Sequence, residues 1–275
     1  MDKSGQLIKK DYENFFPRFW GPYYDPGNRV ARRIVLKILY EDIKHSKNLL
    51  DVGGGVGDMI IELESTWQGH KDFFLLDFSY NSLQKAKRYA NVLNINLMAI
   101  KGNADSLPIK SDAINIVTCR ETLEHIQNDK SAAREMFRIL KLHGKVLIHV
   151  PVESKPTVWA GHFRCYTKKG LSYLLGKAGF GIIRCSFICK IARFLWGYPK
   201  FLIYLLWLLY TGNILKRIKK VEFPSYYNSW FHKKIVMPIF DKLLVLDYIF
   251  SIRGKYKSGA NILVVGEKTT TNRKY

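Results

Sequence analysis

The sequence contains few cysteines, and their spacing argues against two common uses of this residue. Four cysteines occur among 275 residues, none of them in a Cys-x-x-Cys pair, and no cluster of histidines completes a zinc site. We therefore expect neither a structural zinc centre nor a disulfide framework. The four residues are predicted to be free thiols, most of them buried as small apolar side chains: Cys119, Cys165, Cys185 and Cys189.

The sequence also lacks an apolar run long enough to cross a membrane. The uncharged stretch from Phe201 to Leu215 has fifteen residues, fewer than the roughly 20 that a bilayer-spanning helix needs. The segment from Met1 to Trp20 is polar and of mixed charge, without the apolar core of a secretion signal. These absences predict a protein that stays in the cytoplasm.

Acidic residues are scarce in this chain. The sequence has 23 Asp and Glu against 44 Lys and Arg, so its formal net charge is +21. About half of this excess falls between Arg184 and Lys257, which hold 14 basic and 3 acidic residues between them. A hydrophobic content of 47% is sufficient for a sizeable core. We expect one domain of average size with a basic insertion.

The most informative stretch is rich in glycine and runs from Leu49 to Asp58, Leu-Leu-Asp-Val-Gly-Gly-Gly-Val-Gly-Asp. An apolar run that ends in an acid and four glycines within five residues predicts a buried strand, a tight turn and the start of a helix. Glycines allow left-handed backbone dihedrals and let a flat ligand approach the main chain. We interpret the loop as part of a cofactor site.

Three classes of ligand fit a glycine-rich loop, and the neighbouring residues distinguish them. A phosphate loop needs Gly-Lys-Ser/Thr, but Gly57 is followed by Asp58. A dinucleotide fingerprint needs a third small residue where this chain has Asp58 or Ile60, which weakens that interpretation. Asp51 and Asp58 flank the loop with negative charge, which favours a cationic nucleoside ligand over a pyrophosphate.

Further apolar segments end in polar motifs. Phe73–Asp77 is a predicted second strand whose terminal carboxylate is placed to bind both hydroxyls of a ribose. A third strand, roughly 96–100, leads into Gly-Asn-Ala-Asp-Ser-Leu-Pro at 102–108. A fourth, roughly 113–119, leads into Arg-Glu-Thr-Leu-Glu-His-Ile at 120–126. Helical patterns between the strands predict an α/β fold.

With these four motifs in this order, the stretch from Leu49 to Phe180 resembles the class I S-adenosylmethionine-dependent methyltransferases, most closely the small-molecule branch that includes quinone-biosynthesis enzymes. The resemblance implies a Rossmann-like, seven-stranded sheet with helices on both faces. It also implies S-adenosyl-L-methionine as the cofactor. One departure is that Ile114-Asn115-Ile116-Val117 lacks the Asp usual in the fourth-strand motif. This changes the support of a loop but removes no expected cofactor contact.

The resemblance also implies which residues contact each part of the cofactor. Asp51 and the glycine loop would contact the methionine part, and Asp77 would bind the ribose. The adenine would lie among residues 78 and 103–105, and residues 120–121 would line the sulphonium end. The implied cofactor-binding residues are Asp51, Gly53, Gly54, Gly55, Gly57, Asp77, Phe78, Asn103, Ala104, Asp105, Arg120 and Glu121.

The methyl group of a sulphonium is already activated, so the protein must mainly align a nucleophile and, for a hydroxyl, remove its proton. His125, next to Glu124, is the first candidate base and His162 is the second, although either could instead cap a loop. Glu121-x-x-Glu124-His125 also resembles the Glu-x-x-Glu-His metal site of some quinone and RNA-end methyltransferases, which would suit a hard divalent ion. Many relatives carry Glu-His here without a metal, so the preferred prediction is no metal.

About seventy residues separate the predicted sixth strand from the last strand, Asn261 to Gly266, far more than an ordinary loop. This insert contains the apolar stretch 201–215, a basic run at 216–220 and a second apolar helical pattern from Trp230 to Phe250. Such a composition fits helices that lie on an anionic membrane surface. Nucleic acid is the competing partner for a basic protein, and a buried hairpin or a dimer interface is the third interpretation.

These observations predict three parts of the chain. Residues 1–48 form an N-terminal lid and first helix, residues 49–188 and 259–268 form the cofactor-binding domain, and residues 189–258 form a helical, membrane-associating insert. The predicted function is S-adenosylmethionine-dependent methylation, at oxygen, of an amphipathic or lipid-linked acceptor at the inner face of a membrane. The alternatives are methylation of RNA or of a soluble small molecule, and a catalytically silent binding module.

Overall fold

The computed structural model describes residues 26–66, 72–153, 161–188 and 261–270, together with Ile249 and Ser258. Two sequence predictions therefore lie largely or wholly outside the described residues. These are the N-terminal lid and the helical insert over residues 189–258. Among the described helices, none combines the length and the hydropathy that crossing a bilayer requires.

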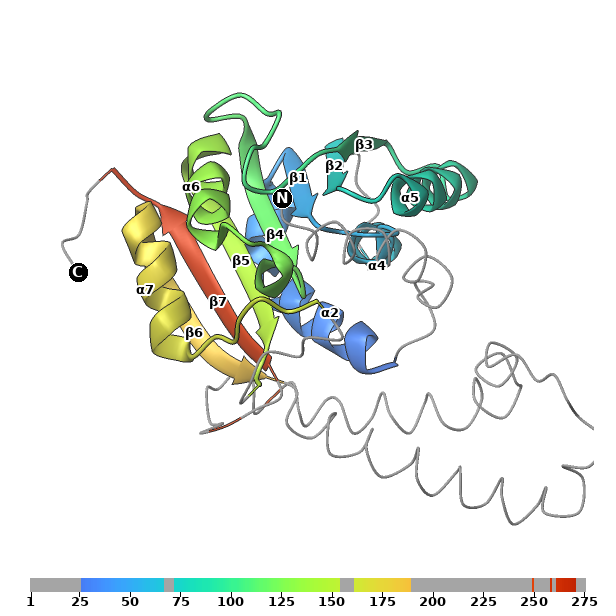
Figure 1. Ribbon diagram of the computed structural model, residues 1–275. Coiled ribbons are helices and arrows are strands. Elements are labelled where there is room, and N and C mark those ends of the chain that lie inside the picture. Colours follow the sequence, from blue (N-terminus) through green and yellow to red (C-terminus); the bar gives the residue numbers. More distant parts are fainter. Residues whose placement is uncertain are drawn as a thin grey trace, which may run out of the picture.

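Seven strands of the described residues form one sheet in the order β3-β2-β1-β4-β5-β7-β6. The pairs from β3 to β5 are parallel, whereas β7 is antiparallel to both β5 and β6, as Figure 1 shows. The strands are β1 (Asn48–Val52), β2 (Asp72–Asp77), β3 (Leu97–Lys101), β4 (Ile114–Arg120), β5 (Leu140–Pro151), β6 (Phe180–Ile188) and β7 (Asn261–Lys268). Strand order reverses at β1 and β4, where open α/β sheets bind ligands beyond the carboxyl ends of the strands.

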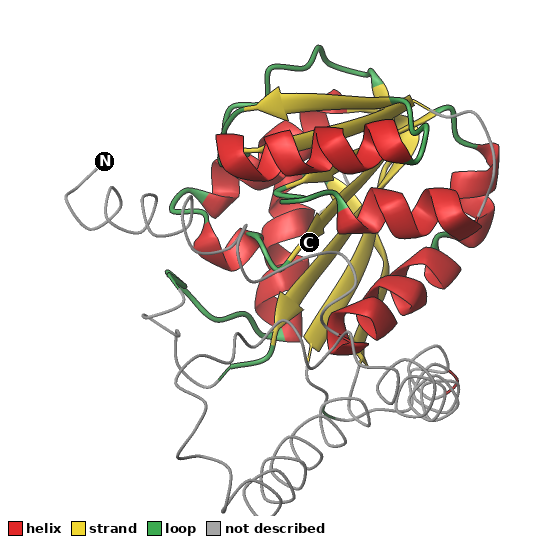
Figure 2. Cartoon of the chain, turned by 90° about the vertical axis from the view of Figure 1, so that its right-hand side faces the viewer, coloured by secondary structure: helices red, strands yellow, loops and turns green. Residues whose placement is uncertain are grey.

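Helices cover both faces of this sheet (Figure 2). Leu49 belongs to one apolar core and Leu50 to the other, because successive side chains of a strand point to opposite faces. Side chains of α2, α4 and α5 pack in the first core, and those of α6 and α7 pack in the second. The helices are α2 (Pro26–Ile38), α3 (Tyr40–His45), α4 (Asp58–Thr66), α5 (Tyr80–Val92), α6 (Asp129–Ile139) and α7 (Lys168–Ala178).

The sequence predicts that Thr167 caps the start of a helix and that Gly179 ends it, and the ends of α7 confirm both predictions. Oγ1 of Thr167 accepts a hydrogen bond from the N–H of Gly170 at 3.0 Å, which caps the start of the helix. Gly179 ends the helix in the left-handed region, with φ of 112°. The predicted helix from Asn28 to Tyr40 is interrupted, because α2 ends at Ile38 and α3 begins at Tyr40.

An apolar helical pattern over Ser131–Leu140 predicts that Gly144 lies just past the end of a helix, and this prediction was wrong. Helix α6 ends at Ile139 and the chain passes directly into β5. The pairing of β4 with β5 shifts between Ile114 and Ile116, so extra residues of β5 bulge from the ladder. A Cβ on Gly144 would lie 2.7 Å from the carbonyl oxygen of Lys141. Glycine is needed there for a close backbone approach within the bulge.

The cysteine prediction is confirmed only in part for the described residues. Cys119, Cys165 and Cys185 are free thiols. Of these, only Cys119 is fully buried, and the other two are half-buried. Cys189 lies outside the described residues.

Candidate active site

The glycine-rich turn follows β1 and leads into α4. Gly53, Gly55 and Gly57 have φ values of 67°, 56° and 79°, in the left-handed region that favours glycine. The N–H of Gly53 donates to the carbonyl oxygen of Leu76 at 2.7 Å, which ties the turn to β2. The N–H of Gly57 donates to the carbonyl oxygen of Gly54 at 2.9 Å and closes the turn. The turn therefore has the backbone conformation that its sequence predicted.

The space around each glycine distinguishes a packing role from a ligand role. A Cβ on Gly53 would lie 2.2 Å from Cγ2 of Thr122, and a Cβ on Gly54 would lie 2.4 Å from Oδ2 of Asp51. A Cβ on Gly55, by contrast, would meet no atom of the described part of the chain within 4 Å. Gly53 and Gly54 are thus required by protein packing. The main chain at Gly55 faces open space and is accessible to a ligand.

Asp77 is the last residue of β2 and joins that strand to the glycine loop. Its Oδ2 accepts a hydrogen bond from the N–H of Gly55 at 2.8 Å, and its Oδ1 accepts one from the N–H of Ser79, also at 2.8 Å. Burial raises the pKa of the Asp77 carboxyl, and these backbone hydrogen bonds oppose the rise. The carboxylate of Asp77 is thus hydrogen-bonded to the accessible Gly55, at the position where the sequence predicted a contact with ribose.

Asp51 lies within β1, almost completely buried beneath the same loop. Oγ1 of Thr118 donates a hydrogen bond to its Oδ1 at 2.7 Å. Burial raises the pKa of Asp51 to about 7, although the Thr118 hydrogen bond and the charge of Arg120 favour the ionised form. Asp51 therefore supports the loop from below and changes its charge near neutral pH.

The residues predicted to contact adenine lie at the same edge of the sheet. Strands β2 and β3 are parallel and in register through Asp77, so the loop after β3 leaves the sheet beside Asp77. In this loop Ala104 is buried, Asp105 is half-buried and Asn103 is exposed. Phe78, which follows β2, is half-buried. Their contacts with a cofactor stay a prediction.

Glu121 is oriented towards β5 and β7, immediately after β4. Its backbone has φ of 47°, and its N–H donates to the carbonyl oxygen of His149 at 2.8 Å. Its Oε1 accepts a hydrogen bond from Nδ2 of Asn261 at 2.9 Å and lies 3.2 Å from Nδ1 of the buried His149. Sequence reasoning missed the contacts of His149 and Asn261, because both residues lie in segments that were interpreted only as strands.

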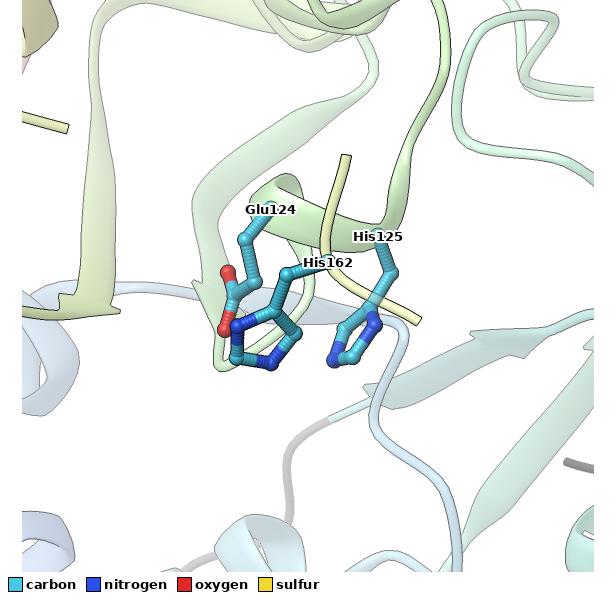
Figure 3. A group of neighbouring side chains, drawn as sticks. All are labelled: Glu124, His125 and His162. Atoms are coloured by element: carbon cyan, nitrogen blue, oxygen red, sulfur yellow. The ribbon is translucent and has the colours of Figure 1, made fainter. Parts of the chain in front are cut away.

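A cluster of three side chains forms beside the short 3-10 helix η1 (Leu123–His125). Glu124, His125 and His162 each offer one ligand atom, and these atoms lie within 4.8 Å of one another (Figure 3). The rings of His125 and His162 meet edge to face, with centroids 4.6 Å apart. The N–H of Phe163 donates to the carbonyl oxygen of Glu124 at 2.9 Å and holds the two segments together.

This cluster contains all three residues predicted to be catalytic. It differs from the Glu-x-x-Glu-His set that the sequence resembles, because His162 rather than Glu121 accompanies Glu124 and His125. Within the described residues, no other set of three or more His, Cys, Asp or Glu side chains has this proximity.

Each imidazole in the cluster is oriented through its Nδ1 atom. Nδ1 of His125 lies 3.2 Å from the carbonyl oxygen of Gly161, and Nδ1 of His162 lies 2.7 Å from Oε2 of Glu153. A carbonyl oxygen can only accept, so Nδ1 of His125 carries the proton, and a carboxylate at Nδ1 favours the same tautomer in His162. In the neutral imidazole of His125, Nε2 therefore carries no proton.

Burial controls the charges of this cluster. Glu124 is 1% exposed, and both of its carboxylate oxygens are buried without a hydrogen-bond partner among the residues that the structure describes. Burial, followed by repulsion from Glu121, raises the pKa of Glu124 well above its ordinary value. Burial, followed by the neighbouring His162, lowers the pKa of His125 to about 4. The imidazole of His125 is therefore neutral at neutral pH.

Thr122 connects this cluster to the glycine loop. Its Oγ1 donates to the carbonyl oxygen of Arg120 at 2.7 Å and lies 3.3 Å from that of Gly53. Helix η1 begins at the next residue, Leu123. The catalytic candidates thus follow directly from a residue that packs on the predicted cofactor loop.

Comparison with known proteins gives one family match and several relatives. Residues 43–179 match a family described as a methyltransferase domain. The chain is 29% identical over 154 residues to 2-methyl-6-phytyl-1,4-hydroquinone methyltransferase of Arabidopsis thaliana. This match covers 54% of the chain and 44% of the relative. It is 28% identical over 141 residues to demethylmenaquinone methyltransferase of Staphylococcus haemolyticus. This match covers 51% of the chain and 58% of the relative.

In most of these curated relatives, the match with this chain covers about half of the relative's length or less. Among solved structures, it is similar to a putative sarcosine dimethylglycine methyltransferase from Galdieria sulphuraria, with a TM-score of 0.61 and 13% identity. That match covers 96% of this chain and 99% of the other. At this identity the similarity shows the fold alone.

Proposed function

The chain belongs to the class I S-adenosylmethionine-dependent methyltransferases, and on this premise we propose that it methylates a hydroxylated, amphipathic acceptor of the quinol type at a membrane surface. When bound, S-adenosylmethionine supplies a methyl group that its positive sulphur has already activated. The chain must bind the nucleoside, align the acceptor and remove the acceptor's proton.

The observation that carries the proposal is the pairing of Gly55 with Asp77. Gly55 leaves the main chain open, and Asp77 accepts a hydrogen bond from its N–H group. Carboxylate oxygens retain further lone pairs, so Asp77 can also accept from the two hydroxyls of a ribose. These features fit a nucleoside cofactor, and the acids near the loop fit its cationic sulphonium.

The acceptor class is supported by the relatives and by the cluster beside η1. One relative is named for a phytyl hydroquinone and another for demethylmenaquinone. A phenolic hydroxyl of such a ring must lose its proton to make its oxygen, or the adjacent ring carbon, nucleophilic. Glu124, which is buried, and the half-buried His125 and His162 provide a polar site for that hydroxyl. Transfer to oxygen is our prediction, and a relative named as a C-methyltransferase makes carbon the alternative product.

The membrane part of the proposal is supported by sequence composition. The segment from Arg184 to Lys257 has a net charge of +11, from 14 basic and 3 acidic residues, and includes the apolar stretch 201–215. Basic residues beside an apolar surface favour contact with anionic lipid. An acceptor with an apolar tail would be presented to the enzyme from the same membrane.

A methyl-transfer assay with labelled cofactor tests the function. We would compare a prenyl-tailed quinol in anionic vesicles, the same ring without its tail in solution, and a short RNA. The proposal predicts labelled tailed quinol, formed roughly tenfold faster or more than labelled product from the tail-less ring. Preferential labelling of RNA would replace the quinol with a nucleic-acid acceptor. No labelled product, together with no cofactor binding, would indicate a silent binding module.

A further inference from the structure

The loop after β3 contains a tight turn whose first end is tied to β2. Residues 103–106 form the turn. Just before it, the N–H of Gly102 donates to the carbonyl oxygen of Asp77 at 3.1 Å. Ala104 and Asp105, which are predicted to contact adenine, occupy the two middle positions of the turn. The main chain on either side of these two residues therefore determines their orientation.

An ion pair on α6 binds the other end of this turn. Oε2 of Glu135 accepts a hydrogen bond from the N–H of Leu107 at 2.8 Å, and Nη2 of Arg138 donates to the carbonyl oxygen of Leu107 at 3.0 Å. Both main-chain groups of the residue directly after the turn are thus bonded to one pair of side chains. The side chain of Leu107 is buried in the second apolar core. Moving Leu107 would therefore break two hydrogen bonds and expose an apolar side chain.

The guanidinium of Arg138 extends this contact along the loop. Its Nη1 donates to the carbonyl oxygen of Ile109 at 2.8 Å and lies 3.3 Å from Oγ of Ser111. Its Nε and Nη2 donate to the two carboxylate oxygens of Glu135 at 2.7 Å and 2.8 Å, which is the bidentate geometry of a strong ion pair. Every nitrogen of the guanidinium is therefore engaged, and a lysine could not reproduce the arrangement.

Two simpler roles do not account for these contacts. A basic residue in the last turn of a helix often binds the last carbonyl groups of that helix, whereas Arg138 donates to carbonyl groups 29 and 31 residues earlier in the chain. An exposed ion pair contributes little to stability, but the side chains of Glu135 and Arg138 are 21% and 35% exposed and share a network of loop contacts. The hydrogen bond from Arg138 lowers the pKa of the Glu135 carboxyl, so the pair stays ionised at neutral pH.

We propose that Glu135 and Arg138 are positioning residues that hold the turn in the conformation that selects adenine. The exocyclic amino group of adenine is a hydrogen-bond donor, and the carboxylate of Asp105 is the predicted acceptor. A site that hydrogen-bonds a ligand N–H rejects an analogue without it, provided that the protein group is held in place. This role rests on the proposed function, because the turn has a base to select only if the chain binds a nucleoside.

Hydrogen exchange of the ligand-free full chain, followed by mass spectrometry, tests whether the ion pair holds the turn. Arg138→Lys keeps the charge but loses the bidentate geometry, and Glu135→Gln keeps the shape but loses the charge. The matched control is Arg134→Gln, one turn earlier on α6, where the guanidinium donates within the same helix. Amides of residues 102–111 should exchange about tenfold faster in both ion-pair variants than in wild type or the control. Exchange in β1 should not change.

Calorimetric binding of two nucleosides tests the role in selecting the base. S-inosylhomocysteine has a carbonyl oxygen where S-adenosylhomocysteine has the amino group. We expect wild type and Arg134→Gln to prefer S-adenosylhomocysteine by about tenfold or more, and Arg138→Lys and Glu135→Gln to lose most of this preference. Ile139→Val removes a buried methyl group from the same helix, so it controls for a general loss of stability. It should keep the wild-type preference.

The possible results separate this role from the proposed function. An unchanged preference in folded Arg138→Lys and Glu135→Gln, or unchanged exchange in the loop, would overturn the positioning role and leave the function intact. Equal weakening of both nucleosides would reveal a structural contribution only and would overturn it as well. Wild type that binds neither nucleoside would contradict the proposed function itself. Thermal melting establishes that each variant is folded.

Discussion

Asp51 is a carboxyl group in the core of a parallel sheet, with the hydroxyl of Thr118 2.7 Å from its Oδ1. Burial raises its pKa to about 7 from the usual 3.8. Between these values the folded chain keeps a proton that the unfolded chain releases. Stability from protonated Asp51 is therefore fully present below about pH 4 and is lost as the pH rises towards 7.

We predict that Asp51→Asn removes this pH dependence. Asparagine keeps the acceptor for Thr118 but carries no charge, so its free energy of unfolding should exceed that of wild type at pH 8 by on the order of 3 kcal/mol. At pH 4 the two should be nearly equal. Urea denaturation at both pH values measures this, with the exposed Asp72→Asn as control. If wild type had a lower free energy of unfolding than Asp51→Asn by the same amount at both pH values, the result would contradict the argument.

At the scale of elements, the glycine loop provides a pair of matched substitutions. Gly53→Ala combines a positive φ with a Cβ that would lie 2.2 Å from Thr122, whereas Gly55→Ala has a positive φ but no neighbour within 4 Å. We expect Gly53→Ala to lower the free energy of unfolding by about 2–4 kcal/mol, and Gly55→Ala by about 1 kcal/mol.

Gly55→Ala, which should lose less stability than Gly53→Ala, should show the larger loss of ligand affinity. Gly55→Ala should stay folded but bind S-adenosylhomocysteine about tenfold more weakly, because its methyl group fills the space left for the ligand. Denaturation and calorimetry on the same samples separate the two effects. A Gly55→Ala variant with wild-type affinity would show that the open space at Gly55 is not where the cofactor binds.

The elements explain how far sequence reasoning reached. The positions of strands and helices could be predicted from the spacing of apolar residues and from the glycines and acidic residues at the ends of these segments. The predicted seven-stranded sheet with helices on both faces is confirmed. Motifs after β1, β2, β3 and β4 could be placed at one edge, because parallel strands end there together. Local pattern could not predict the bulge at Gly144, which depends on register between β4 and β5.

The site was predictable only in part, for a related reason. Glu121 contacts His149 and Asn261, and Asn261 lies 140 residues later in the chain. His162 joins Glu124 and His125 through a return of the chain before α7. Spacing along the sequence therefore placed Glu124 and His125 together but could not indicate that His162 joins them, because tertiary contacts decide which side chains form the cluster.

At the scale of the whole molecule, the excess of basic residues makes a separate prediction. Replacing four basic residues by glutamate would reverse the charge of the basic run beside the apolar stretch 201–215. These residues are Lys216, Arg217, Lys219 and Lys220. Since each basic residue near an anionic surface contributes about 1 kcal/mol, flotation with anionic vesicles should fall by well over tenfold.

A control with equal charge change makes this result specific. Lys87, Lys110, Lys130 and Lys169 are exposed on the described domain, and their replacement by glutamate should reduce flotation far less. Equal losses in both variants would indicate general attraction by net charge. Failure of wild type to float would count against the membrane proposal and favour an RNA or soluble acceptor.

The measurement that tests the methyltransferase assignment most directly is calorimetric binding of S-adenosylmethionine and S-adenosylhomocysteine. Asp77→Asn keeps the size of the side chain but removes its charge, so affinity should fall about 10–100-fold from weakened ribose hydrogen bonds. Asp72→Asn, at the opposite end of β2, should bind as wild type does. Micromolar binding by wild type with this difference between the variants is the predicted result. No binding by wild type, or equal binding by Asp77→Asn, would contradict the proposed cofactor site.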